Sequence, residues 1–272
     1  MRIVTLVENE SEKRSLKSAH GLSLYIEHNK KKILFDLGPG KQYIKNAKKL
    51  GIDLKEIDIC IISHGHYDHG RGIDTFLRLN KKANVYVSKE AFGKMYKSVK
   101  GIYLPIGIKK PMFSKRIIEV ETDMKIENGI KLYTEIPFEQ QVIKDDSLLV
   151  KTPNGFEEDD FDHEIYLVLY ANSSKVLFTG CSHKGIENII DSIEKQERKG
   201  FTGVVGGFHF SHYDSGNLRE SMYLEKLSEK LVAKEGVEYY TGHCTGDEAY
   251  LEMKNIMKSS IHRIRSGSEF RL

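Results

Sequence analysis

Three cysteines are the only thiols in this 272-residue sequence, and they are too few and odd in number for a disulfide framework. No stretch approaches the ~20 consecutive apolar residues that a membrane-spanning helix needs. The opening residues MRIVTLVENE lack the long apolar core of a signal peptide. These absences predict a cytoplasmic protein that does not insert into a membrane.

An excess of one charge sign is also missing. The sequence has 42 basic and 39 acidic residues and a net charge of +3, so we expect no nucleic-acid partner. Hydrophobic residues make up 39%, which allows a sizeable core and excludes a disordered chain. There is no repeat array or low-complexity linker, and the five prolines mark no boundary. We therefore predict one domain over residues 1–272.

Strand and helix patterns alternate along the chain, which indicates the α/β class. Strands are expected over residues 2–8, 22–28, 31–38, 57–63, 83–88, 117–121, 131–135, 203–209, 238–244 and 261–266, with a further hairpin over 164–183 that turns at 172–174. Helices are expected over residues 42–52, 72–80, 90–98, 185–198, 219–234 and 246–257.

Histidine is concentrated in one turn, SHGHYDHGRG, directly after a buried strand. This turn places His64, His66, Asp68 and His69 within six positions. Three later strands also end in a glycine followed closely by a histidine: His183, His209 and His243. Sites in open α/β sheets gather beyond the carboxyl ends of strands, and glycine lets the backbone turn sharply there. We expect all four strand ends to converge on one cleft.

Imidazole and carboxylate together form the donor set of a zinc, iron or manganese site. The turn offers four donors in six residues, so it can serve two adjacent metals, and a two-metal site lowers the pKa of a bridging water. The alternative is a surface turn with chance histidines. The density of donors after a buried strand favours the metal site.

The pattern His64-x-His66-x-Asp68-His69 resembles the signature of the metallo-β-lactamase fold hydrolases. ILFDLGPG resembles the first motif of that family, VLFTGCSH lies where the family has strand-Thr-Gly-Asp, and YYTGHCTG resembles its last motif. The resemblance implies a four-layer αββα sandwich with a dinuclear site along one edge. It also implies that Asp36 supports the metal-binding loop by hydrogen bonding and is not a ligand.

One branch of the family is more similar still. HGLSLYIE, SHGHYDHGRG, TGCSHKGIENI, GGFHF and TGHCTG together resemble the group labelled 7,8-dihydropterin-6-methyl-4-(β-D-ribofuranosyl)aminobenzene-5′-phosphate synthase-like. That label derives from tetrahydromethanopterin synthesis. The resemblance is therefore a better guide to the fold and the metal site of this chain than to its substrate.

The sequence departs from the family pattern in two places. The Pro-Gly-His-Thr motif is missing, and the nearest histidine, His163, is interpreted as a surface residue. The bridging aspartate is replaced by Cys181, which is either a thiolate ligand or a small buried residue supporting the site. We infer that His183 fills a ligand position vacated by one of these losses.

The predicted site holds two divalent ions, with zinc as the first choice and manganese or iron as alternatives. One ion is bound by His64, His66 and His183, and the other by Asp68, His69 and His243. A metal-bound hydroxide, oriented by Asp68, attacks a phosphoester or related ester. His209 protonates the departing oxygen, or ligates metal, binds a substrate anion, or is a core histidine.

An insertion around residues 95–160 is expected to shape the substrate pocket. Within it, Lys109, Lys110 and Arg116 either meet a phosphate or lie on the surface. The expected partner is a small-molecule substrate, with a phosphorylated one and a homodimer left open. Of the remaining histidines, His20 could approach the site from the opposite sheet, and His212 lies in a loop. We assign His28 and His262 to the solvent side of strands.

Two other function classes stay open. A pterin-condensing transferase would use the metals to bind a diphosphate leaving group, and it would release pyrophosphate without hydrolysing simple esters. A non-enzymatic metal or ligand sensor would bind metal and turn over no ester.

Overall fold

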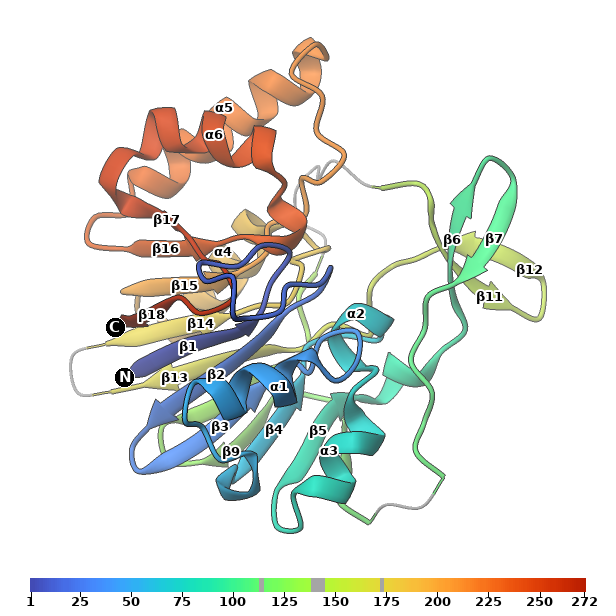
Figure 1. The fold of residues 1–272 in the computed structure, drawn as a ribbon. Helices are drawn as coiled ribbons and strands as arrows, with labels where there is room; N and C mark the ends of the chain where they lie inside the picture. The colour runs from blue at the N-terminus through green and yellow to red at the C-terminus, as the bar shows by residue number, and fades with distance from the viewer. Residues whose placement is uncertain (113–114, 138–144, 172–173) are drawn as a thin grey trace.

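Two seven-stranded mixed sheets pack face to face in the computed structural model, which describes residues 1–112, 115–137, 145–171 and 174–272 (Figure 1). The first sheet has the order β18-β1-β2-β3-β4-β5-β8, built from Glu269–Arg271, Arg2–Val7, Ser23–His28, Lys31–Phe35, Ile59–Ile62, Asn84–Ser88 and Ile117–Val120. The second has the order β17-β16-β15-β14-β13-β10-β9, built from Ile261–Arg263, Glu238–Thr241, Gly203–Gly206, Lys175–Phe178, Tyr166–Tyr170, Ile130–Tyr133 and Met124–Glu127.

Helices cover the outer faces of both sheets. On the first sheet these are α1 (Gln42–Lys49) and α3 (Ile73–Leu79), and on the second they are α4 (Ile186–Glu197), α5 (Leu218–Val232) and α6 (Asp247–Met257). Side chains alternate along each strand, so Leu34 packs toward the helices while Ile33 and Phe35 pack against the opposite sheet. The result is the predicted αββα sandwich.

Two hairpins were predicted with the right strands. β2 and β3 pair antiparallel, and their turn residues Asn29 and Lys30 both have positive φ, 47° and 64°, as a two-residue hairpin turn requires. β13 and β14 pair antiparallel as expected, although residues 172–173 of the predicted turn lie outside the described residues.

A third sheet forms an arm beside the sandwich, visible on the right of Figure 1. Its order is β12-β11-β6-β7, over Gly155–Glu158, Leu148–Thr152, Met95–Val99 and Ile102–Pro105. The predicted helix over 90–98 is wrong, because a 3₁₀ turn over Lys89–Phe92 leads directly into β6. The rings of Tyr96 and Tyr103 pack on Phe156, with centroids 5.0 and 4.0 Å away, so cross-strand packing decides the conformation here.

Two further predictions need correction. The last strand is not the one at 261–266, since β18 follows it and pairs with β1, which brings the chain termini together. His28 is buried and not on the solvent side, because the turn at Gly129 packs against it.

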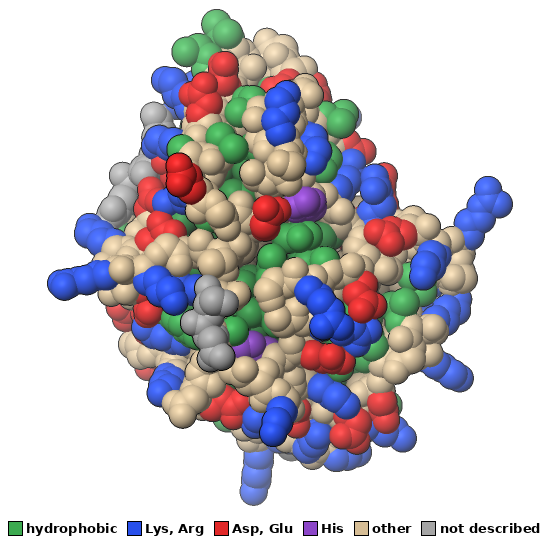
Figure 2. Space-filling model, turned by 90° about the vertical axis from the view of Figure 1, so that its left-hand side faces the viewer, with side chains coloured by type: hydrophobic (Ala, Val, Ile, Leu, Met, Phe, Trp, Pro, Cys, Tyr) green, Lys and Arg blue, Asp and Glu red, His purple; other side chains and the backbone are tan. Residues whose placement is uncertain are grey.

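The surface mixes charges. On the face in Figure 2, basic and acidic side chains are interspersed. Among the described residues, no helix is both long and apolar enough to cross a membrane.

Candidate metal centre

A cleft of about 960 Å³ lies beyond the carboxyl ends of β4, β14, β15 and β16. β4 belongs to the first sheet and the other three to the second, so the cleft joins both halves of the sandwich. Its lining includes six of the predicted site residues: His66, Asp68, Cys181, His183, His209 and His243. His64 and His69 are fully buried beside them. The structure therefore brings the four predicted strand ends together.

The first group of donors consists of His64, His66 and His183, whose ligating atoms all lie within 4.8 Å of one another. His64 Nε2, His66 Nε2 and both ring nitrogens of His183 are buried and have no hydrogen-bond partner among the described residues. Buried polar atoms are normally paired, since leaving one unpaired costs free energy. Burial lowers the pKa of all three rings, that of His66 to about 3, which favours the neutral imidazole that binds metals.

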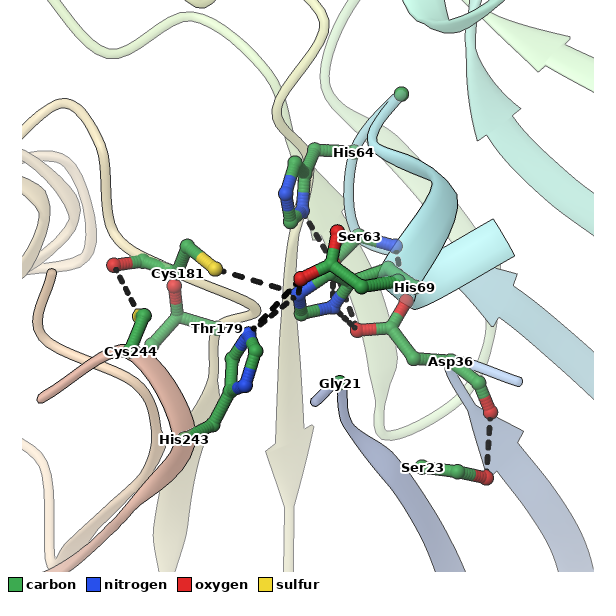
Figure 3. A network of polar contacts seen from close by, with 12 residues as sticks. Gly21, Ser23, Asp36, Ser63, His64, His69, Thr179, Cys181, His243 and Cys244 are labelled. Carbon is green, nitrogen blue, oxygen red and sulfur yellow. Dashed lines mark hydrogen bonds and ion pairs between the residues drawn. The ribbon is translucent and has the colours of Figure 1, made fainter. Parts of the chain in front are cut away.

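Asp36 fixes the orientation of His64 through a relay. Ser63 Oγ donates to Asp36 Oδ2 at 2.7 Å, so the hydroxyl oxygen accepts from His64 Nδ1 at 2.9 Å (Figure 3). His64 then carries its proton on Nδ1 and leaves the Nε2 lone pair free. Asp36 also accepts from the Ser63 backbone N–H at 2.7 Å, so the start of the histidine-rich turn is tied to this carboxylate.

The second group consists of Asp68, His69 and His243. His69 Nδ1 donates to Asp36 at 2.6 Å and His243 Nδ1 donates to Asn9 Oδ1 at 3.0 Å, so both rings present a bare Nε2. These two Nε2 atoms lie only 3.1 Å apart, and two lone pairs that close need a cation or a shared proton between them. The arrangement fits a divalent ion, which can accept both lone pairs.

Charge in this second group supports the same interpretation. Burial disfavours the charged form of Asp68, but His69 and His243 outweigh it and lower the pKa of the carboxyl. Burial also opposes protonation of His69, yet Asp36 and Asp68 outweigh it and raise its pKa to about 9. Without a metal, the group therefore attracts a proton to the position where a cation would sit.

Cys181 and His209 lie next to the two donor groups. Cys181 Sγ is 3.2 Å from His69 Nε2, and the thiol is buried. The His209 ring packs 4.0 Å from that of His183, and both His209 nitrogens are buried without a hydrogen-bond partner in the described parts of the chain. His209 and His243 have φ of 56° and 50°, a strained conformation for residues other than glycine and one that clusters at functional sites.

Two buried glutamates, which the sequence analysis missed, hold the backbone of the two late histidines. Glu164 Oε1 accepts the His183 N–H at 2.9 Å, and Glu8 Oε1 accepts the His243 N–H at 2.7 Å. Each glutamate lies far from its histidine in sequence, by 19 and 235 positions, so no local motif links them. The available signal was an acidic residue beside an apolar strand pattern: Glu8 follows one, and Glu164 precedes another.

Replacing Glu164 with alanine is expected to weaken the affinity of the first group for a metal about 10–100-fold, as loss of a supporting partner does. The N–H groups of His183 and Lys184 and the hydroxyl of Tyr166 would lose their acceptor. The measurement is a competitive zinc titration with a chelator. Glu164→Gln, which keeps one acceptor oxygen, should lose less affinity. Equal affinity in the alanine variant and the wild type would contradict this role.

His163 is not the surface residue that was predicted. It is buried, its Nδ1 accepts the Gly65 N–H at 3.1 Å, and its Nε2 donates to Asp159 at 3.0 Å. Both ring nitrogens therefore have hydrogen-bond partners, and His163 stabilises the histidine-rich turn instead of ligating metal.

The three residues predicted either to bind a phosphate or to lie on the surface occupy different places in the structure. Lys109 lines the cleft, Lys110 pairs with Glu119, and Arg116 donates to backbone carbonyls.

Comparison with known proteins agrees with this geometry. The family model described as the metallo-beta-lactamase superfamily matches residues 19–241. An uncharacterized protein of Methanocaldococcus jannaschii is 28% identical and aligns with 93% of this chain and 94% of that relative. The 7,8-dihydropterin-6-methyl-4-(beta-D-ribofuranosyl)-aminobenzene-5′-phosphate synthase of the same organism is also 28% identical, over 98% of this chain and 95% of the relative.

Among solved structures, Tm1679, described as a metal-dependent hydrolase of the beta-lactamase superfamily, superposes with a TM-score of 0.83. It is 29% identical, and the match covers 100% of this chain and 99% of that one.

Proposed function

The chain belongs to the metallo-β-lactamase superfamily, and on this basis we propose that it is a two-cation hydrolase of phosphoesters or related esters. The observation that carries the proposal is the pair of adjacent donor groups at the cleft. One group has buried ring nitrogens without partners, and the other has two Nε2 atoms 3.1 Å apart beside Asp68. The two groups together offer six donors, more than the four of a tetrahedral ion, which favours two cations over one.

In this proposal His64, His66 and His183 hold the first cation, and Asp68, His69 and His243 hold the second. The cations are zinc in the first instance, with manganese or iron as alternatives, because imidazole and carboxylate do not discriminate sharply among these ions. Such a pair supplies Lewis acidity and a lowered pKa for water at the cleft.

The chain's own residues orient the reactants. Asp68 presents a carboxylate to the cleft and accepts a hydrogen bond from the attacking water. His209 donates a proton to the departing oxygen. Burial opposes the protonation of His209, but the neighbouring Cys244 outweighs burial and raises the pKa of the ring. Asp36 supports the site by accepting hydrogen bonds from Ser63 and His69, and Cys181 supports it by packing beside His69.

The insertion around 95–160 shapes the substrate end of the cleft. Leu104, Ile106 and Lys109 from this segment line it, together with Arg71 from the histidine-rich loop. Apolar and cationic side chains in one cleft suit a small anionic substrate with an apolar part, and a phosphate ester is such a molecule. We expect a cytoplasmic enzyme of a single domain that binds no nucleic acid, with a homodimer left open.

A second candidate is a pterin-condensing transferase. It is favoured by the relative that is named as a dihydropterin-related phosphate synthase and that aligns with nearly the full length of this chain. The two candidates share the metal centre and differ in whether water or an organic nucleophile reacts.

The test of the hydrolase uses chain stripped of metal and reloaded with zinc, manganese or iron. We expect hydrolysis of bis-p-nitrophenyl phosphate by the loaded protein and its loss in the stripped protein. Release of pyrophosphate from a dihydropterin diphosphate, with no turnover of simple esters, would replace the hydrolase with the transferase. Metal binding without either reaction would leave a sensor.

A further inference from the structure

We propose that His20 is a fourth protein ligand of the second cation, which neither the sequence pattern nor the comparisons assign. The inference rests on the two-cation site proposed above. His20 lies in the loop between β1 and β2, and its ring centroid is 4.8 Å from that of His243, which follows β16. Its side chain lines the cleft and is 59% exposed, so it can reach an ion from the solvent side.

One carboxylate oxygen lies at the centre of the geometry. Asp68 Oδ2 is 3.4 Å from His20 Nε2, 3.3 Å from His243 Nε2 and 3.7 Å from His69 Nε2. In a tetrahedral site with metal–ligand bonds of about 2.0–2.1 Å, neighbouring donor atoms lie roughly 3.3–3.4 Å apart. The separations of the carboxylate oxygen from the histidine nitrogens are therefore close to the edges of such a tetrahedron. The atoms of His20, Asp68 and His243 also lie together within 4.8 Å.

The loop that carries His20 is built to stay against the histidine-rich turn. Gly21 has φ of 143°, and a Cβ at this position would lie 2.3 Å from the backbone oxygen of Asp68. Only glycine permits so close an approach. Figure 3 shows Gly21 beside the His69–Asp36 pair. The loop is thus held directly against the residues that form the second group.

Asn9 ties the same loop to His243. Its Oδ1 accepts the Nδ1 proton of His243 at 3.0 Å and the Gly21 N–H at 3.2 Å, and its Nδ2 donates to the His243 carbonyl at 3.1 Å. One side chain therefore sets the tautomer of His243 and the position of the loop that carries His20. The same contacts hold His20 close to His243, with their ring centroids 4.8 Å apart.

The sequence also gives a reason for an extra ligand. Cys181 stands where a carboxylate is expected from the family pattern, and its Sγ lies near His69 on the buried side of the group. A donor from the opposite, solvent side completes the set. The alternative is that His20 is protonated and only forms an ion pair with Asp68, in which case removing it would not weaken metal binding.

The test is a Co²⁺ titration of the metal-free full chain, followed by visible absorption and calorimetry. We compare the wild type with His20→Ala, and use His212→Ala as the matched control. His212 lines the same cleft and its side chain is 58% exposed, but it pairs with Asp145 away from the two donor groups. Unfolding temperatures without metal establish that each variant is folded.

We expect two binding steps in the wild type and in His212→Ala. In His20→Ala the first step should be unchanged, while the second should weaken at least tenfold and lose its absorption intensity. Two steps of wild-type affinity and spectrum in His20→Ala would overturn the assignment of His20 alone. A single step in the wild type would instead overturn the two-cation site, and the ligand role of His20 with it.

Discussion

Replacing His183 with alanine is expected to remove one of two bound cations and to slow the hydrolysis of bis-p-nitrophenyl phosphate at least a hundredfold, about 2.7 kcal/mol of barrier. His64 and His66 follow β4 of the first sheet, whereas His183 follows β14 of the second. His183 therefore supplies the donor that completes the first group. The measurement is metal content per chain by elemental analysis, with turnover assayed on the same samples.

His262→Ala is the matched control for this experiment. His262 is half-exposed, pairs with Glu238 and does not line the cleft, so its loss should change neither metal content nor turnover. If the His183 variant kept both cations, the assignment of His183 would be wrong. Cys181 would then be the next candidate, because the ring nitrogens of His163 are already bonded to Gly65 and Asp159.

Asp36→Ala is expected to lower the free energy of unfolding by ~3–5 kcal/mol, even in the metal-free chain, because breaking a buried charged network leaves its partners uncompensated. Asp36 is fully buried and accepts from the Ser63 N–H, the Ser63 hydroxyl and His69 Nδ1. Without Asp36, the protons on Nδ1 of His64 and His69 would no longer be held in place. We therefore expect metal binding to weaken ~10–100-fold. Urea unfolding and zinc titration measure the two effects.

Asp58→Ala is the matched comparison for this prediction. Asp58 also accepts a backbone N–H, from Lys32 at 2.9 Å, but it lies near the surface and its ion-pair partner Lys82 is half-exposed. We expect a loss of ~1 kcal/mol or less and unchanged metal affinity. Equal losses of unfolding free energy in the two variants would contradict this prediction. They would mean that the hydrogen bonds of Asp36 to Ser63 and His69 stabilise the fold no more than a surface carboxylate does.

The fold and the main donors could be predicted because their signals are local. The turn from His64 to His69 follows a continuous apolar strand, and the glycine–histidine endings before His183 and His243 repeat that form. Strand ends of two sheets then meet at one edge, which placed these residues in the same cleft. The alternation of strands and helices predicted the α/β class, and the αββα sandwich followed from the family resemblance.

Residues that act through long-range contacts were not predictable. Glu8 and Glu164 hold backbone groups that are distant in sequence, and Asn9 reaches His243 from the loop between β1 and β2. Of this loop the sequence indicated only that His20 could approach the site. The arm was missed because β6 has a helical spacing in its own sequence, and one of its two partners, β11, lies some 50 positions further on, while the other is β7. Local patterns carry no information on such partners.

The most direct test of the two-cation site is a crystal structure of the zinc-loaded chain with anomalous diffraction data collected above and below the zinc edge. We predict two anomalous peaks, one among His64, His66 and His183 and the other among Asp68, His69 and His243. A single peak, or a second peak outside the Asp68–His69–His243 group, would contradict the site proposed here.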